Sequence, residues 1–103
     1  MKISIANEAG KIIITVDGDI NEKGSEELKN TFSQMQTAPP PFVVLDLSGV
    51  SQIGSSGIGK ILLFYKNLAI KNSRLEVIGL SPLLFELFHE LKLDSLFTIA
   101  KRK

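Results

Sequence analysis

Residues 42–59 read FVVLDLSGVSQIGSSGIG, and this stretch decides the fold. Its first part, residues 42–47, is nearly all apolar, which predicts a strand covered on both faces, as in a parallel sheet. Its last part, residues 54–59, places three glycines and two serines at the start of a helical pattern. A buried strand that leads into a helix is the unit from which parallel α/β sheets are built.

The rest of the chain repeats this alternation on both sides of that unit. Strands are expected at residues 3–5, 12–16, 42–47, 74–78 and 96–99. Helices are expected from residue 22, from about residue 56 to 71, and from residue 82. The order β-β-α-β-α-β-α-β predicts a single α/β domain over residues 1–103. Its sheet is mixed, mainly parallel and four- to five-stranded, with helices packed on it.

Local signals mark the helix starts and the core. Asn21 can cap the first helix, and Ser81 followed by Pro82 is typical of the start of the last one. The apolar stripes of the three helices predict these buried side chains: Leu28, Phe32 and Met35; Ile58, Ile61, Leu62, Tyr65, Leu68 and Ala69; Leu84, Leu87, Phe88 and Leu91.

Composition excludes several classes of protein. The chain is 44% hydrophobic and 22% charged, which is typical of a folded domain. It has no cysteine, so disulfides, thiolate metal sites and a cysteine nucleophile are excluded. A net charge of +1 predicts no direct nucleic-acid binding. No apolar run approaches the roughly 20 residues that cross a bilayer, and the first residues lack a signal peptide's apolar segment, so we expect a cytoplasmic protein.

The segment Gly54-Ser55-Ser56-Gly57-Ile58-Gly59 allows two interpretations. A helix N-terminus offers unpaired N–H groups and a positive dipole end, which would suit a phosphorylated serine. Glycines there would let a partner's backbone approach closely. Alternatively, Ser55 or Ser56 is only the helix cap and the glycines form a tight turn. A nucleotide-binding P-loop is a poor third option, because the Gly-Lys-Ser/Thr ending is missing and the loop is too short.

The helix that follows has a second, polar face. At about 100° per residue, Ser56, Lys60, Leu63, Asn67 and Lys71 are expected to point away from the apolar stripe. Phe64 is expected at the edge of this outer face. Exposed apolar residues beside a candidate phosphorylation site would suit a partner surface, although scattered ones are also normal on any protein.

An enzyme is the competing class. His89 is the only histidine, and it lies with Glu86 and Glu90 on what reads as a solvated helix face. Asp17 and Asp19 are explained by a turn at a strand end. No metal-ligand spacing and no nucleophile–base pair is evident, so the sequence predicts a non-enzymatic protein without a cofactor or metal.

Residues 43–59 resemble the signature of STAS domains, and more narrowly that of bacterial anti-sigma factor antagonists. The pattern of that family is an apolar strand ending in Asp-Leu-Ser, a short loop, and then Asp-Ser-Ser-Gly-Leu-Gly. Residues 18–21 resemble its Gly-Glu-Leu-Asp turn, residues 75–79 its next strand, and residues 93–97 its Leu-Asp-x-Leu-Phe segment. Two positions depart from the pattern, because Gly54 and Asn21 stand where the family has acids.

The resemblance implies a partner-switching cycle that regulates sigma-factor-dependent transcription. The unphosphorylated antagonist binds an anti-sigma factor that carries a histidine-kinase-like serine kinase domain. Phosphorylation of the second serine of the pair, Ser56 here, releases it, and a PP2C-type phosphatase resets it. The alternative is a STAS regulatory subunit of a transporter or stress-sensing complex that is not phosphorylated. We expect a monomer or a weak dimer.

The resemblance and the helix face together predict the residues of a partner-binding surface. These are Asp19, Asn21, Gly54, Ser55, Ser56, Gly57, Ile58, Gly59, Lys60, Leu63, Phe64 and Asn67.

Overall fold

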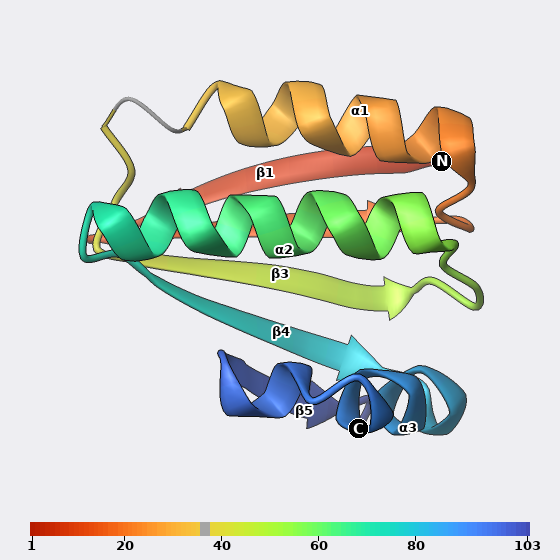
Figure 1. The fold of residues 1–103 in the computed structure, drawn as a ribbon. Coiled ribbons are helices and arrows are strands. Elements are labelled where there is room, and N and C mark those ends of the chain that lie inside the picture. The colour runs from red at the N-terminus through yellow and green to blue at the C-terminus, as the bar shows by residue number, and fades with distance from the viewer. Residues whose placement is uncertain (36–37) are drawn as a thin grey trace.

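The computed structural model describes residues 1–35 and 38–103 (Figure 1). Its elements are β1 (Lys2–Glu8), β2 (Lys11–Asp17), α1 (Glu22–Ser33), β3 (Phe42–Gly49), α2 (Ser55–Ile70), β4 (Arg74–Leu80), α3 (Pro82–Glu90), the short 3₁₀ helix η1 (Leu93–Ser95) and β5 (Thr98–Lys101). They follow one another in the predicted order. The last strand begins later than expected, because residues 93–95 form η1 and Phe97 is drawn into the core.

The strands form one sheet in the order β1-β2-β3-β4-β5. β1 runs antiparallel to β2, and every other neighbouring pair is parallel. The structure therefore confirms the prediction of a mixed, mainly parallel sheet. The carboxyl ends of β2, β3 and β4 lie at the same edge, where the chain turns into α1, α2 and α3 (Figure 1).

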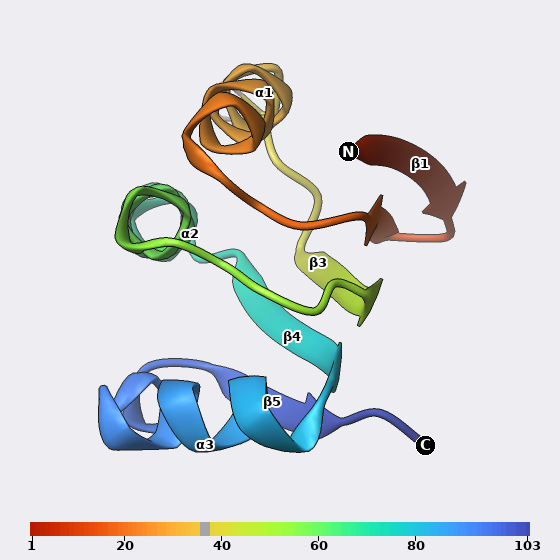
Figure 2. The same cartoon turned by 90° about the vertical axis from the view of Figure 1, so that its right-hand side faces the viewer.

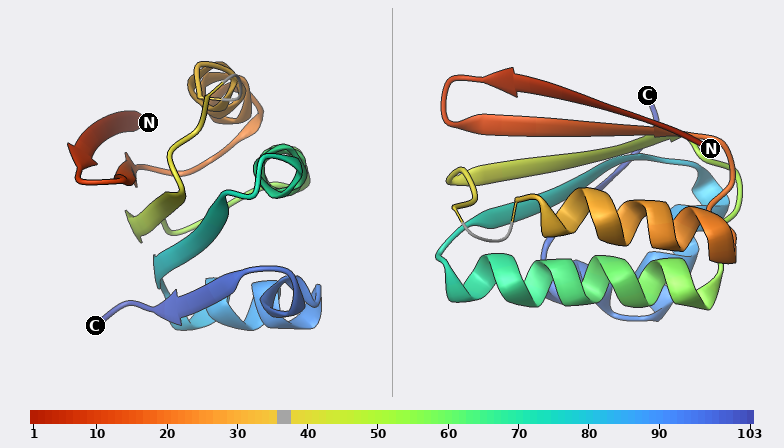
Figure 3. Two further views of the ribbon diagram at one scale, coloured as in Figure 1. Left: turned by 90° about the vertical axis from the view of Figure 1, so that its left-hand side faces the viewer. Right: turned by 90° about the horizontal axis from the view of Figure 1, so that it is seen from above.

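All three α-helices lie on the same side of the sheet (Figures 2 and 3). The expectation that β3 is covered on both faces was therefore wrong for the described residues. Val44 points away from the helices, yet it is only 5% exposed. Its register neighbours Ile13 on β2 and Glu76 on β4 lie beside it on that face. An apolar strand in the middle of a sheet can thus be shielded by neighbouring strands instead of a second helical layer.

The helix starts show which of the predicted cap residues cap a helix in the structure. The side chain of Asn21 accepts a hydrogen bond from the N–H of Gly24 at 2.9 Å, and Ser81 does the same for Leu84 at 3.2 Å. Both predicted caps are confirmed. The alternative interpretation, in which Ser55 or Ser56 caps α2, was wrong, because α2 begins at Ser55 and its cap residue is Gly54, which has no side chain to donate or accept.

The core lies between the sheet and the helices, and α1 packs beside α2. Phe32 of α1 stacks on Phe64 of α2 with ring centroids 4.0 Å apart and nearly parallel rings. The predicted α1 residues Leu28, Phe32 and Met35 are all buried.

The buried stripe of α2 differs from the prediction. It is formed by Gly57, Ile61, Phe64 and Leu68. Ile58, Leu62 and Tyr65 are only half-buried, and Ala69 is exposed. The stripe is rotated from the predicted one because α2 is covered by the sheet and also by α1 at its side.

The buried stripe of α3 is also narrower than predicted. Leu84 and Phe88 are buried, Leu87 is half-buried, and Leu91 is exposed beyond the end of the helix. Among the described residues, we find no helix with the length and apolar character needed to cross a bilayer.

Candidate functional site

The predicted surface is built on two loops at the carboxyl ends of β2 and β3. The N–H of Ile20 donates to the carbonyl of Gln52 at 2.9 Å, and the N–H of Gly54 donates back to the carbonyl of Ile20 at 3.0 Å. Ile20 and Ile53 thereby form an isolated parallel bridge. The turn before α1 and the loop before α2 are held together as one platform, which we define as residues 18–21 and 49–54.

The first turns of α1 and α2 meet beside this platform (Figure 1). The Oγ atoms of Ser25 and Ser56 lie 2.9 Å apart. Ser25 donates its one hydroxyl hydrogen to the carbonyl of Asn21 at 2.8 Å. Since a serine has a single hydrogen to donate, the hydroxyl of Ser56 must donate to Ser25. The result is a chain of hydrogen bonds from Ser56 through Ser25 to the cap residue of α1.

This contact corrects the predicted orientation of Ser56. We expected its side chain on the outer face of α2, but it is half-buried and faces α1. Ser25, its partner, is only 1% exposed. Ser55 is the exposed member of the pair. Ser25 itself was not predicted, although it precedes the apolar stripe of Leu28 and Phe32 at helical spacing and could have been recognised as a polar residue on a buried face.

The three glycines of the segment have different reasons to be glycine. A Cβ on Gly57 would lie 2.7 Å from Cγ2 of Ile20 and 2.9 Å from Cγ1 of Ile53, so the platform itself requires a glycine there. A Cβ on Gly54 would make only an ordinary contact, 3.8 Å from the carbonyl oxygen of Ile20. A Cβ on Gly59 would meet nothing within 4 Å. Internal packing therefore explains Gly57 but does not explain Gly59.

The other predicted residues separate into exposed and buried ones. Leu63 is 50% exposed, as expected, and Lys60 and Asn67 beside it are half-buried. Phe64 is 1% exposed and stacked on Phe32, so its assignment to the partner surface was wrong. Phe64 lies at the edge of the outer face, and α1 packs against this edge. The sequence of α2 alone does not indicate that α1 covers it.

Asp19 and Asn21 lie on the platform and have structural partners. Asp19 Oδ1 accepts a hydrogen bond from the N–H of Gln52 at 3.2 Å, and Asn21 caps α1. Both line a shallow groove of about 240 Å³ together with Ile20, Gln52, Ile53 and Gly54. Gln52 and Ile53 were not among the predicted site residues. They could have been found from their position in the loop between β3 and α2.

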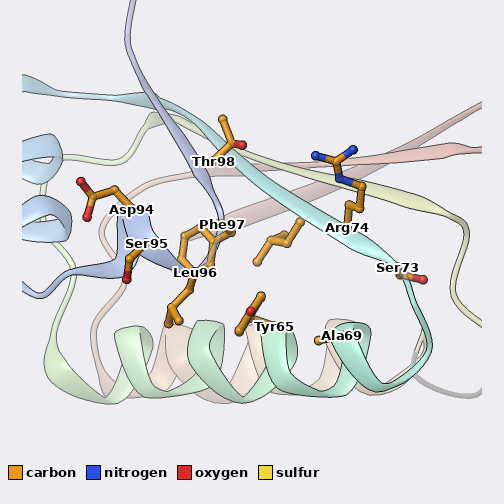
Figure 4. A pocket seen from close by; sticks show the side chains of 10 residues that line it. Tyr65, Ala69, Ser73, Arg74, Asp94, Ser95, Leu96, Phe97 and Thr98 are labelled. Atoms are coloured by element: carbon orange, nitrogen blue, oxygen red, sulfur yellow. The ribbon is translucent and has the colours of Figure 1, made fainter.

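The surface also offers a different kind of site, a hollow of about 380 Å³ between α2 and the β5 edge (Figure 4). Figure 4 shows Arg74 and Thr98 extending away from Tyr65 and Ala69, so the polar groups do not converge on one point. The Asp94 carboxylate is hydrogen-bonded to the His89 ring at 2.7 Å, which lowers the pKa of that carboxyl. No cluster of metal-ligating side chains occurs in residues 1–35 and 38–103.

Comparison with known proteins places this chain in a family. A family model described as "Mlab, STAS domain" matches residues 3–99. The chain is 30% identical to the anti-sigma-B factor antagonist of Listeria monocytogenes over 102 residues, which cover 96% of this chain and 90% of that protein.

Two solved structures share the fold. One is an anti-sigma factor antagonist from Mycobacterium paratuberculosis, with a TM-score of 0.86 at 23% identity over 96% of this chain and 84% of that one. The other is the Bacillus cell fate determinant SpoIIAA in its phosphorylated form, with a TM-score of 0.78 at 17% identity over 97% and 92% of the two chains.

Proposed function

Because the chain belongs to the STAS domain family, we propose that it is an anti-sigma factor antagonist. In this proposal it binds an anti-sigma factor that is also a serine kinase, and phosphorylation of Ser56 releases it. The Listeria relative bears the name of such an antagonist and matches along nearly the whole chain. The anti-sigma factor would dock on the platform and on the first two turns of α2.

The observation that carries this proposal is Gly59. A glycine inside a helix costs roughly 1 kcal/mol relative to alanine, and nothing in the fold compensates for this cost at an open position. A partner backbone that docks closely on the first turns of α2 would require that position 59 has no side chain. Exposed Leu63 lies one turn further along the same helix and would supply apolar contact area.

The charge that a phosphate brings would be the switch. A phosphoserine carries about −1.5 to −2 charges near pH 7. The cap residue of α2 makes no side-chain hydrogen bond to the first turn of the helix. The backbone N–H groups of that first turn therefore remain available to the phosphate. Buried against the anti-sigma factor, that charge would cost about 3 kcal/mol and weaken binding roughly 100-fold. No change of fold is needed.

Phosphorylation first requires that Ser56 leaves Ser25. The hydroxyl of Ser56 must turn out of its hydrogen bond before a kinase can reach it. The net cost of losing one such bond is about 0.5–1.5 kcal/mol, which a bound kinase can supply. A PP2C-type phosphatase would reverse the modification and restore binding.

The proposal is tested with the anti-sigma factor kinase of the same organism, ATP and mass spectrometry. We expect one phosphate on the wild type and on Ser55→Ala, and none on Ser56→Ala. Calorimetric titration of the phosphorylated chain should give about 100-fold weaker binding than the unmodified chain. Labelling that is equal in Ser56→Ala and the wild type, or undiminished binding after phosphorylation, would contradict the switch.

Two observations favour a second candidate, a STAS regulatory subunit that is not phosphorylated. Ser56 is half-buried and engaged by Ser25, and Gly54 provides no carboxylate beside the serine pair. Such a subunit would bind a transporter or a stress-sensing complex through the same surface. Binding that persists in Ser56→Ala, together with no phosphate on the wild type under any kinase tested, would select this candidate.

A further inference from the structure

The first strand, β1, is an unprotected sheet edge. It is one end of the strand order, and no described segment lies along its outer side (Figures 2 and 3). Its seven residues pair with β2 in continuous register, without a bulge. All but Ile3 are exposed. Proteins normally blunt such an edge with charges, proline, a bulge or short length, because unpaired N–H and C=O groups attract another strand.

The opposite edge, β5, has the protection that β1 lacks. It has only four residues, and its pairing with β4 contains a register shift. Lys101 lies on it, above the ring of Phe85 in α3. The middle of β1, residues 4–7, carries no charge, and Ile5 is 45% exposed.

We propose that β1 pairs with β1 of a second copy of this chain. The two strands would run antiparallel about a twofold axis at Ile5 and join two sheets into one continuous sheet. Such an interface is isologous, because the same residues are contributed from both sides. The helices of both copies would lie on the same face of the joined sheet, since the twofold axis stands perpendicular to it.

Charge complementarity selects this register. Centring the pair on Ile5 places Lys2 opposite Glu8 of the second copy, at both ends of the seam. It also places the two exposed Ile5 side chains opposite each other. In an antiparallel pair, two opposite residues either both direct their N–H and C=O groups toward the partner strand or both direct them away from it. These two kinds of residue alternate along each strand, so registers shifted by one residue are excluded. Centring on Ser4 or Ala6 keeps that rule but leaves Lys2 and Glu8 without opposite charges.

The size of the seam sets its strength. Seven residues on each side supply about six to eight backbone hydrogen bonds. They bury far less than the roughly 800 Å² per partner of a standard interface. The dimer is therefore weak and forms with increasing concentration. β2, β3 and α1 separate the seam from α2, so a dimer leaves α2 of each copy free to bind the proposed anti-sigma factor (Figure 2).

Sedimentation equilibrium over a dilution series from about 1 mM to about 1 μM tests the proposal, since weak interfaces dissociate in that range. We expect the wild type to change from dimer to monomer within the series. Ile5→Lys places two ammonium groups at the twofold axis and should give a monomer throughout. A wild type that is monomeric at the highest concentration would overturn the proposal.

Charge reversal tests the register itself. Lys2→Glu and Glu8→Lys each place like charges together twice in one dimer, so each should weaken dimerisation about two- to thirtyfold. The double variant restores both opposite-charge pairs and should recover the wild-type dissociation constant. The matched control is Lys66→Glu, which reverses an exposed charge on α2, away from the seam, and should leave dimerisation unchanged.

The outcomes separate this dimer from the proposed partner switch. Failure of the double variant to recover, at unchanged melting temperature, would exclude the Lys2–Glu8 register. Loss of dimerisation in Lys66→Glu equal to that in Lys2→Glu would show a general charge effect and overturn the seam. Phosphorylation of Ser56 is measured on the monomeric Ile5→Lys variant, so either proposal can fail without the other.

Discussion

The starts of α2 and α3 follow two strands of the same sheet, yet they are built differently. α3 follows β4 directly, with the side chain of Ser81 bonded to the first turn and Pro82 at its first position. α2 follows β3 after a glycine-containing loop, and its cap residue, Gly54, leaves the first turn without a side-chain bond. The first turn of α3 is capped by the Ser81 side chain, whereas the first turn of α2 has no side-chain cap. This difference supports the proposal that another molecule docks at the start of α2.

The largest expected effect concerns the platform that carries α2. Gly57→Ala pushes a Cβ against the branched side chains of Ile20 and Ile53, which cannot move aside as a flexible chain end could. Overpacking costs about 1–3 kcal/mol, partly offset by the better helix preference of alanine. We expect the free energy of unfolding, measured in urea, to fall by about 1–2 kcal/mol.

Gly59→Ala is the matched control for that variant, because its Cβ enters open space. It should raise the free energy of unfolding by about 0.5–1 kcal/mol and at the same time weaken anti-sigma factor binding. Equal binding by this variant and the wild type would remove the main support for docking on α2.

The helix starts can be tested against each other. Ser81→Ala removes a cap bond and should cost about 1 kcal/mol of stability, measured by urea unfolding. Gly54→Ser supplies the side chain that α2 lacks, and it should stabilise the fold by a few tenths of a kcal/mol. If Gly54→Ser destabilised the fold as much as Ser81→Ala, the first turn of α2 would have no N–H group free to donate to a serine cap.

The features that could be predicted from the sequence are those that depend on residues close together in the chain. Asn21, Ser81 and Pro82 were predictable because a cap depends on residues next to each other in the chain. The Ser25–Ser56 contact and the burial of Phe64 were not, because they depend on how α1 sits beside α2. Helical periodicity indicates that a helix has a buried face, but it does not say how many neighbours bury it.

A smaller effect is expected where α1 and α2 meet. Ser25→Ala removes the acceptor of the Ser56 hydroxyl and frees that side chain to turn outward. The initial rate of Ser56 labelling by the kinase should rise about two- to tenfold, the equivalent of one hydrogen bond. Ser33→Ala is the matched control, because Ser33 makes a similar bond to the carbonyl of Lys29 far from Ser56. A slower reaction in Ser25→Ala would mean that Ser25 helps to present Ser56.

The smallest effect lies at the far end of α3. The hydrogen bond from His89 lowers the pKa of Asp94 from its ordinary value of 3.8. A carboxyl with a lowered pKa stabilises the fold above its unfolded pKa, and this contribution is lost as the pH falls through the folded value. Asp94→Asn should therefore be slightly less stable than the wild type at neutral pH, with the difference vanishing below the folded pKa. Thermal melts in a pH series would measure this, and a constant difference at every pH would rule out the pair as its cause.

The hydrogen-bond chain from Ser56 through Ser25 to Asn21 gives the molecule a built-in readout. A change at Ser56 deprives Ser25 of its donor, and Ser25 lies in the first turn of a different helix. The backbone amides of Gly24 and Ser25 should consequently shift in a nuclear magnetic resonance spectrum whenever Ser56 is modified or turned outward. Two signals on α1 would then report the state of a residue on α2 in real time, without a fluorescent probe and without the partner present.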